Sequence, residues 1–125
     1  MHRDYWSPAV RARDGYKCQW CLYRGKVFLP QPKGLHAHHI VPVGVCGNAG
    51  RLDIDDGMSL CYYDHFHRIK QDPDGYIAFR TSWLKERGIN YQDMLAKYRQ
   101  NFQKWDYDFV EAKKIELEEI IKKYK

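Results

Sequence analysis

The sequence predicts an α+β domain in which short strands occupy the first half of the chain and helices the second. In residues 35–41 two sets of side chains alternate with the two-residue period of a strand. After residue 80 the apolar residues recur with the period of a helix. Five of the six histidines and all four cysteines lie between residues 18 and 67. With 125 residues the chain has about the size of one domain, so we predict a single domain over residues 1–125.

The N-terminal segment predicts a short helix over residues 4–13. Ser7 is the expected N-cap, and Pro8 stands in the first turn, where its missing N–H breaks no hydrogen bond. An Asp-Gly turn then leads into a short strand over residues 16–18, which ends at the first cysteine.

Loop and strand signals alternate between residues 24 and 54. Glycines and prolines in residues 24–35 predict a loop, and three glycines in residues 44–50 predict a flexible segment. Leu35 to Val41 predicts a strand, and residues 52–54 predict a second, shorter one. Along the first strand two sets of residues alternate: Leu35, Ala37 and His39 against His36, His38 and Ile40.

Helices are predicted for most of the remaining chain. Asp55-Asp56 offers an N-cap for a helix from about Met58 to Lys70, which the Asp-Pro-Asp-Gly sequence at residues 72–75 stops. Three further helices are predicted at about 81–87, 91–103 and 109–124. The last is amphipathic and spans barely two heptads, so we expect it to pack on its own domain rather than form a coiled coil.

Positive charge is concentrated in the first half of the chain. The net charge is +5, and residues 1–52 contain eight basic and two acidic residues, a net charge of +6. Residues 53–125 contain thirteen basic and fourteen acidic residues, a net charge of −1. Because the basic half also holds the Cys-x-x-Cys pair and the adjacent histidines, a polyanion such as nucleic acid is the expected partner.

The sequence gives no sign of export or of a membrane segment. It has no run of about 20 apolar residues, and its polar N-terminus does not resemble a signal peptide. We therefore expect a cytoplasmic protein with no membrane partner. In a reducing compartment a Cys-x-x-Cys pair indicates a metal site before it indicates a disulfide. Whether the protein is a monomer or a homodimer stays open.

Cys18 and Cys21 stand at the spacing of two ligands of one tetrahedral zinc ion. Two more ligands are needed, and Cys61 is the expected third. A residue three or four positions further along a helix would lie on the same face, which nominates Asp64 or His65 as the fourth. The remaining cysteine lies in the glycine-rich segment without a partner nearby, and it is the weaker candidate.

Three short motifs, in this order, resemble the HNH endonuclease family: RARDGYKCQWC, then HHIVP, then DDGMSLCYYDH. The resemblance covers residues 9 to about 70. It implies a ββα-metal (HNH) core, in which two strands and a helix enclose one catalytic divalent ion, with a separate treble-clef-like zinc knuckle. The N-terminal helix and the helices of residues 76–125 would then be extensions of this core.

The resemblance also implies roles for single residues. His38 matches a ligand of the catalytic ion, and His65 matches the helix histidine that completes this site. His39 matches the general base, and an imidazole can accept the proton of an attacking water near neutral pH. Asp56 falls on the family's asparagine, which braces the loop that carries the base or contacts the metal.

Two kinds of bound metal follow from this resemblance. Zn²⁺ is the expected structural ion, and Mg²⁺ or Mn²⁺ the expected catalytic ion. Since Mg²⁺ prefers carboxylates, a site with two imidazoles suits Mn²⁺, Co²⁺ or Ni²⁺ better, and Zn²⁺ is a further candidate. Arg68 and Lys70 are expected to contact phosphate groups of the nucleic acid.

Two departures from the family pattern leave alternatives open. Asp56 can accept the hydrogen bonds of the usual asparagine but cannot donate, and its charge could bind the catalytic ion directly. Asp64 stands where a second cysteine is usual, and a carboxylate is the weaker zinc ligand. If Asp64 does not bind zinc, His65 would complete the zinc site and His67 would become the ligand of the catalytic ion.

The leading hypothesis is a metal-dependent DNA endonuclease of prokaryotic or phage type, acting in the cytoplasm of the host or infected cell. A zinc-stabilised DNA-binding module without catalysis is the alternative, which the changes at Asp56 and Asp64 favour. An RNA-directed nuclease is the third hypothesis, because fold and base do not select the sugar. The aromatic residues of the second half could stack on bases, but their near-helical spacing indicates core. His2 and His36 are expected to be surface residues.

Overall fold

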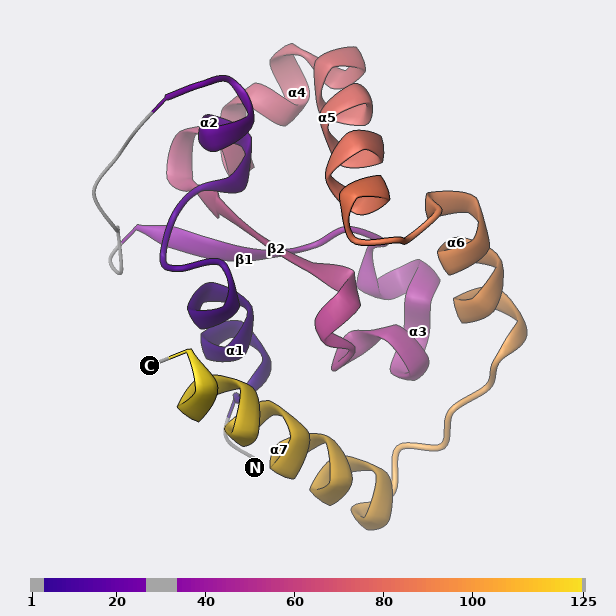
Figure 1. Ribbon diagram of the computed structural model, residues 1–125. Coiled ribbons are helices and arrows are strands. Elements are labelled where there is room, and N and C mark those ends of the chain that lie inside the picture. The colour runs from indigo at the N-terminus through magenta and orange to yellow at the C-terminus, as the bar shows by residue number, and fades with distance from the viewer. Residues whose placement is uncertain (1–3, 27–33, 125) are drawn as a thin grey trace.

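The computed structural model describes residues 4–26 and 34–124, which form helices around one two-stranded sheet (Figure 1). This confirms the predicted mixture of helix and strand. The elements follow one another as α1 (Trp6–Arg13), α2 (Gln19–Tyr23), β1 (Leu35–His39), α3 (Val43–Arg51), the 3₁₀ turn η1 (Ile54–Asp56), β2 (Gly57–Cys61), the π-helical turn η2 (Asp64–Arg68), α4 (Ile69–Gln71), α5 (Pro73–Glu86), α6 (Tyr91–Gln100) and α7 (Tyr107–Lys123).

Strands β1 and β2 are antiparallel, with His38 opposite Met58 and His39 opposite Gly57. Since successive side chains of a strand point to opposite faces, His38 and His39 belong to different sides of the sheet. Helices α1 and α7 lie on one side of the sheet, and α4 and α5 lie on the other (Figure 1).

The His39 side of the sheet packs closely against α1. Trp6 and Val10 of α1 are buried together with Leu117 of α7. Gly57 permits this approach, because a Cβ there would lie 2.9 Å from Cζ2 of Trp6 and closer still to the side chain of Val10. The indole Nε1 of Trp6 also donates a hydrogen bond to the carbonyl of Asp53 at 2.9 Å, which fixes α1 to the segment before β2.

The His38 side of the sheet carries the larger core. Apolar side chains of β2 are buried here in one cluster with aromatic and aliphatic residues of α5 and α6. The most deeply buried members from these three elements are Met58, Leu60, Tyr76, Phe79, Trp83, Leu84, Met94 and Tyr98.

The second strand lies later in the chain than predicted. Residues 52–54 form no strand, because the carboxylate of Asp53 accepts a hydrogen bond from the amide of Asp55 and caps the 3₁₀ turn η1. Strand β2 then occupies residues for which a helix from Met58 is predicted. Its first four residues are buried on both faces, so the polar and apolar alternation of a half-exposed strand is missing. The helical conformation begins only after Cys61.

Three local predictions near the N-terminus and before β2 are also wrong. Ser7 lies inside α1, and the carboxylate of Asp4 accepts hydrogen bonds from the amides of Trp6 and Ser7 instead. Residues 16–18 turn rather than extend, with φ of Tyr16 at 58°. Residues 44–50 belong to helix α3, which bends at Gly47, where φ is 59° and ψ is −156°. The predicted loop at 24–35 falls partly outside the described residues.

The C-terminal helices α6 and α7 lie close to their predicted positions. Helix α5 begins eight residues before its predicted start of about 81, at Pro73, because the carboxylate of Asp72 caps it and accepts a hydrogen bond from the amide of Gly75. The Asp-Pro-Asp-Gly sequence therefore stops one helix and starts the next. Within the part of the chain that the structure describes, no helix is both long and apolar enough to cross a membrane.

Candidate metal sites and the paired histidines

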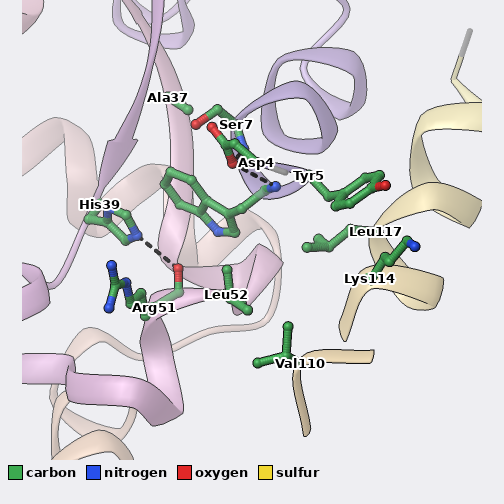
Figure 2. Close-up of a pocket in the computed structure, with 11 residues that line it drawn as sticks. Asp4, Tyr5, Ser7, Ala37, His39, Arg51, Leu52, Val110, Lys114 and Leu117 are labelled. Atoms are coloured by element: carbon green, nitrogen blue, oxygen red, sulfur yellow. Dashed lines mark hydrogen bonds between the residues drawn. The ribbon is translucent and has the colours of Figure 1, made fainter. Parts of the chain in front are cut away.

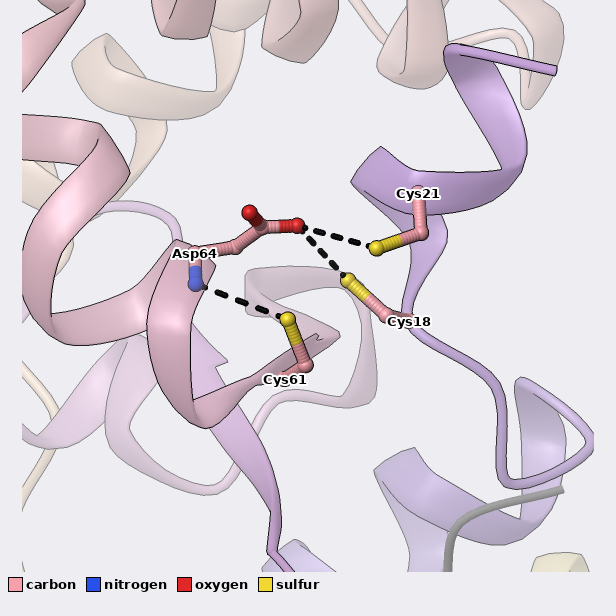
Figure 3. Close-up of side chains that lie close together, drawn as sticks. All are labelled: Cys18, Cys21, Cys61 and Asp64. Carbon is pink, nitrogen blue, oxygen red and sulfur yellow. Dashed lines mark hydrogen bonds between the residues drawn. The ribbon is translucent and has the colours of Figure 1, made fainter. Parts of the chain in front are cut away.

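Four potential metal ligands from separate segments meet at one end of the sheet (Figure 3). Cys18 and Cys21 come from the start of α2, Cys61 ends β2, and Asp64 begins the π-helical turn. One ligand atom from each lies within 4.8 Å of all the others. These residues could therefore hold one metal ion, and three sulfurs with one carboxylate oxygen suit a tetrahedral ion such as Zn²⁺.

Asp64 lies at the centre of this cysteine cluster. Its side chain is only 1% exposed, and its Oδ2 accepts hydrogen bonds from the thiols of Cys18 and Cys21 at 3.1 and 3.3 Å. Arg68 Nε lies 2.8 Å from Oδ1, and Arg24 lies 3.3 Å from Oδ2. Burial alone would raise the pKa of Asp64, but the hydrogen bonds from Cys18 and Arg68 outweigh it and lower the pKa. The side chain is therefore an ionised carboxylate, the form that binds metal.

The pKa values of two thiols in the cluster are raised, whereas that of Asp64 is lowered. Burial raises the pKa of Cys21 to about 11 and that of Cys18 further still. Without a cation, buried thiols beside a carboxylate keep their protons, whereas a bound dication removes them. The fourth cysteine, Cys46, is buried in α3 and lies outside the cluster.

A second cluster contains three imidazoles on the His38 side of the sheet. His36 and His38 alternate along β1, and His65 lies on the π-helical turn. The ring centroid of His65 lies 5.2 Å from that of His38 and 5.3 Å from that of His36. The Nε2 atom of His38 shares a hydrogen bond with the hydroxyl of Tyr76, at 2.7 Å. Among the described residues, the buried Nδ1 of His65 has no hydrogen-bond partner.

Two imidazoles of this histidine cluster, those of His38 and His65, have lowered pKa values and are uncharged at neutral pH. Burial, and next to it the charge of the neighbouring His65, lower the pKa of His38 to about 3. Burial and the nearby His36 lower the pKa of His65. A neutral imidazole keeps the lone pair with which it binds a transition-metal ion.

His39 lies on the other side of the sheet (Figure 2). Its ring stacks on that of Trp6, with centroids 3.8 Å apart and planes 5° from parallel. Its Nε2 lies 3.0 Å from the carbonyl oxygen of Arg51. A carbonyl only accepts, so Nε2 donates this hydrogen bond and Nδ1 keeps the lone pair. Burial lowers the pKa of His39, which leaves the ring a neutral proton acceptor.

A cavity of about 340 Å³ adjoins His39, between the N-terminal part of α1, the sheet and α7. Trp6, Leu117 and other apolar side chains form much of its wall, while Arg51 and Lys114 bring positive charge to it (Figure 2). Asp4 also lines this cavity, so its wall carries two cationic side chains against one carboxylate, a net positive charge that can attract an anionic group to the neighbourhood of His39.

Asp56 has the contacts of a brace. It is fully buried, and its Oδ1 accepts a hydrogen bond from the amide of Val41 at 2.6 Å, just after β1. Burial raises the pKa of Asp56 to about 8, so the side chain is largely protonated at neutral pH. No hydrogen bond among the described residues joins Asp56 to His38 or His65.

The other predicted site residues lie at the edges of these clusters. His67 is exposed, and its ring lies against those of Tyr62 and Tyr63, at 5.7 and 5.4 Å. Of the two predicted phosphate contacts, Arg68 is held by Asp64, whereas Lys70 is exposed and has no ion pair with another described residue.

Sequence reasoning missed three residues of the histidine cluster and its surroundings. His36 could have been found, because it alternates with His38 on a strand and must share its face. Tyr76 and Arg80 lie one helical turn apart on α5, and no sequence signal brings that helix to β1. Arg80 stacks over the ring of Tyr91 at 3.6 Å, and its buried Nε has no hydrogen-bond partner among the described residues.

Comparison of the chain with protein-family models, with curated proteins and with solved structures finds no match. The function therefore has to be inferred from the residues and their geometry.

Proposed function

We propose that this protein is a metal-dependent endonuclease that hydrolyses phosphodiester bonds of DNA, with His39 as the general base. The observation that carries the proposal is the opposite orientation of His38 and His39 on β1. One ring belongs to the histidine cluster, and the other is a neutral ring beside a basic cavity. The order strand, strand, helix and the adjacent cysteine cluster support the resemblance to the HNH family.

The opposite orientation suits an in-line displacement at phosphorus. A water attacks from one side of the phosphate, and the leaving oxygen departs on the other. Nδ1 of His39 accepts the water's proton, while Arg51 and Lys114 attract the phosphates of the strand. A divalent ion bound by His38 and His65 would supply a Lewis acid for the leaving oxygen.

The cysteine cluster has a structural role in this proposal. An ion held by Cys18, Cys21, Cys61 and Asp64, which we propose to be Zn²⁺, would join α2 to the end of β2 and to the π-helical turn. Because His65 follows Asp64 directly, the same ion would fix the backbone from which His65 extends. The structural metal would thus support the catalytic one without taking part in hydrolysis.

A DNA-binding module without catalysis is the second candidate. One observation favours it: the stacking of His39 on Trp6 and its hydrogen bond to Arg51 are also the contacts of a purely structural histidine. The two candidates predict the same affinity for DNA and differ only in hydrolysis.

The deciding experiment incubates supercoiled plasmid with the purified protein in EDTA or with Mg²⁺, Mn²⁺, Co²⁺, Ni²⁺ or Zn²⁺. The nuclease should nick or linearise the plasmid with at least one ion and not in EDTA. Parallel reactions with RNA of matched length test the RNA-directed alternative. A protein that shifts DNA in a gel but cuts neither substrate with any of these ions is the binding module.

A further inference from the structure

The ring distances from His65 to His38 and to His36 match those between two ligands of one ion. With metal–nitrogen distances of about 2.0–2.1 Å and tetrahedral angles, the centroids of two ligating rings lie roughly 5 Å apart. His65 lies at 5.2 Å from His38 and at 5.3 Å from His36 by this measure. His36 and His38 extend from the same face of β1, and His65 contacts both rings.

The hydrogen bonds of the cluster leave nitrogen lone pairs available for an ion. A buried polar atom normally has a partner, yet among the described residues Nδ1 of His65 has none. A histidine that binds metal through one nitrogen usually hydrogen-bonds through the other. For His38 the second bond exists already, because Nε2 is engaged with the hydroxyl of Tyr76 at 2.7 Å. When Nε2 carries the proton and donates it to the tyrosine oxygen, Nδ1 of His38 keeps its lone pair for the ion.

Tyr76 is well placed to hold the ring of His38. It is 8% exposed, and its ring lies 5.7 Å from that of Trp20 and 6.5 Å from that of Phe79. The hydroxyl is therefore carried by a ring that the core fixes. Tyr76 belongs to α5, outside the segment that resembles the HNH family.

The alternative third ligands have other contacts. Asp56 is bonded to the amide of Val41, and His67 lies against two tyrosines on the exposed side of its helix. Of the described residues, those with ligand atoms already within 4.8 Å of one another form the cysteine cluster. The three imidazoles would therefore have to reorient to converge on one ion.

We propose that His36, His38 and His65 together bind one divalent transition-metal ion, and that Tyr76 positions His38 for it. The use of this ion in hydrolysis rests on the nuclease function proposed above, whereas the binding itself does not. Three imidazole nitrogen donors without a carboxylate suit Zn²⁺, Ni²⁺, Co²⁺ or Mn²⁺ and disfavour Mg²⁺.

Calorimetric titration with Ni²⁺ tests this site in protein whose cysteine cluster is first filled with one equivalent of Zn²⁺. The wild-type chain should bind one further ion. His36→Ala should weaken this binding by at least about tenfold, and Tyr76→Phe, which keeps the ring, by about 10- to 100-fold. His67→Ala, a histidine of the same π-helical turn, is the matched control and should bind Ni²⁺ like the parent.

Absorption spectra of the Co²⁺-loaded variants separate a change of ligand from a loss of fold. The visible bands of the second Co²⁺ should shift in His36→Ala, while thermal unfolding stays near that of the parent. Unchanged affinity and spectrum in His36→Ala would overturn its assignment as a ligand, and an effect confined to His67→Ala would assign His67 instead. Wild-type protein that takes up one metal ion only would overturn the whole site. Normal Ni²⁺ binding without DNA cleavage would contradict the nuclease proposal and leave this site standing.

Discussion

The imidazoles of His38 and His39 are adjacent in sequence but lie on opposite sides of β1. The His38 ring is 5.2 Å from that of His65, and the His39 ring stacks at 3.8 Å on Trp6. This separation follows from strand geometry, and it gives the two histidines different surroundings and different expected responses to substitution.

The cysteine cluster should account for one tightly bound structural ion. Cys18→Ser should lose that ion and unfold at ordinary temperature, because a small domain with a structural zinc depends on it for stability. Cys46→Ala, a buried cysteine outside the cluster, should keep the ion. Metal content by mass spectrometry and unfolding by circular dichroism measure both effects. Loss of the ion from Cys46→Ala would show that the ligand set is wrong.

Asp56 should make the protein less stable as the pH rises. Its folded pKa of about 8 lies above its ordinary value of 3.8, so between these values the folded chain holds a proton that the unfolded chain releases. The stability from this group is complete below pH 3.8 and is lost as the pH rises toward 8. Asp56→Asn, which is neutral and can still accept from Val41, should remove this loss.

The gain for Asp56→Asn should be larger at pH 8 than at pH 5 by up to about 4 kcal/mol, because the loss amounts to about 1.4 kcal/mol per pH unit. Urea unfolding at both pH values measures it, with the exposed Asp108→Asn as the matched control. Plasmid cleavage should be retained, because the brace to Val41 remains. An equal change of stability at pH 5 and pH 8 would contradict the protonated state of Asp56.

Lys114 should contact the phosphate backbone of bound DNA. It reaches the cavity beside His39 from α7, whereas Lys122, on the same helix, is mostly exposed and pairs with Glu119. Lys114→Gln should therefore weaken DNA binding in the zinc-loaded protein without added catalytic ion, and lower the slope of log affinity against log salt by about 1. Lys122→Gln should change neither. Equal effects of the two substitutions would mean that DNA does not approach this face.

The types and the spacing of the candidate metal ligands could be predicted from the sequence. The cysteine cluster joins the four predicted residues, Cys18, Cys21, Cys61 and Asp64, because local chemistry determines which side chains can bind zinc. The contact of His38 with His65 was likewise expected from their positions in the motifs. The family assignment itself stays a prediction.

The position of β2 and the contacts of the histidine cluster depend on tertiary packing, which the sequence pattern does not indicate. Strand β2 is buried on both faces, so residues 57–61 show no alternation and were predicted to be helical. Tyr76 reaches His38 only because α5 packs on the sheet, and neither residue signals this contact. His36 and His38 are two residues apart and so lie on the same face of β1. The sequence of one strand does not indicate which residues pack on that face. The partner, His65, comes from a helix whose start was misplaced by four residues.

The central claim, that His39 is the base and His38 a metal ligand, is tested most directly by plasmid cleavage as a function of metal concentration. His39→Ala should lower the maximal cleavage rate by at least about 10²-fold at every metal concentration, with unchanged binding of DNA and of the ion. His38→Ala should instead require more metal and recover part of its activity when metal is added. Full activity of His39→Ala, or its recovery by added metal, would contradict the account.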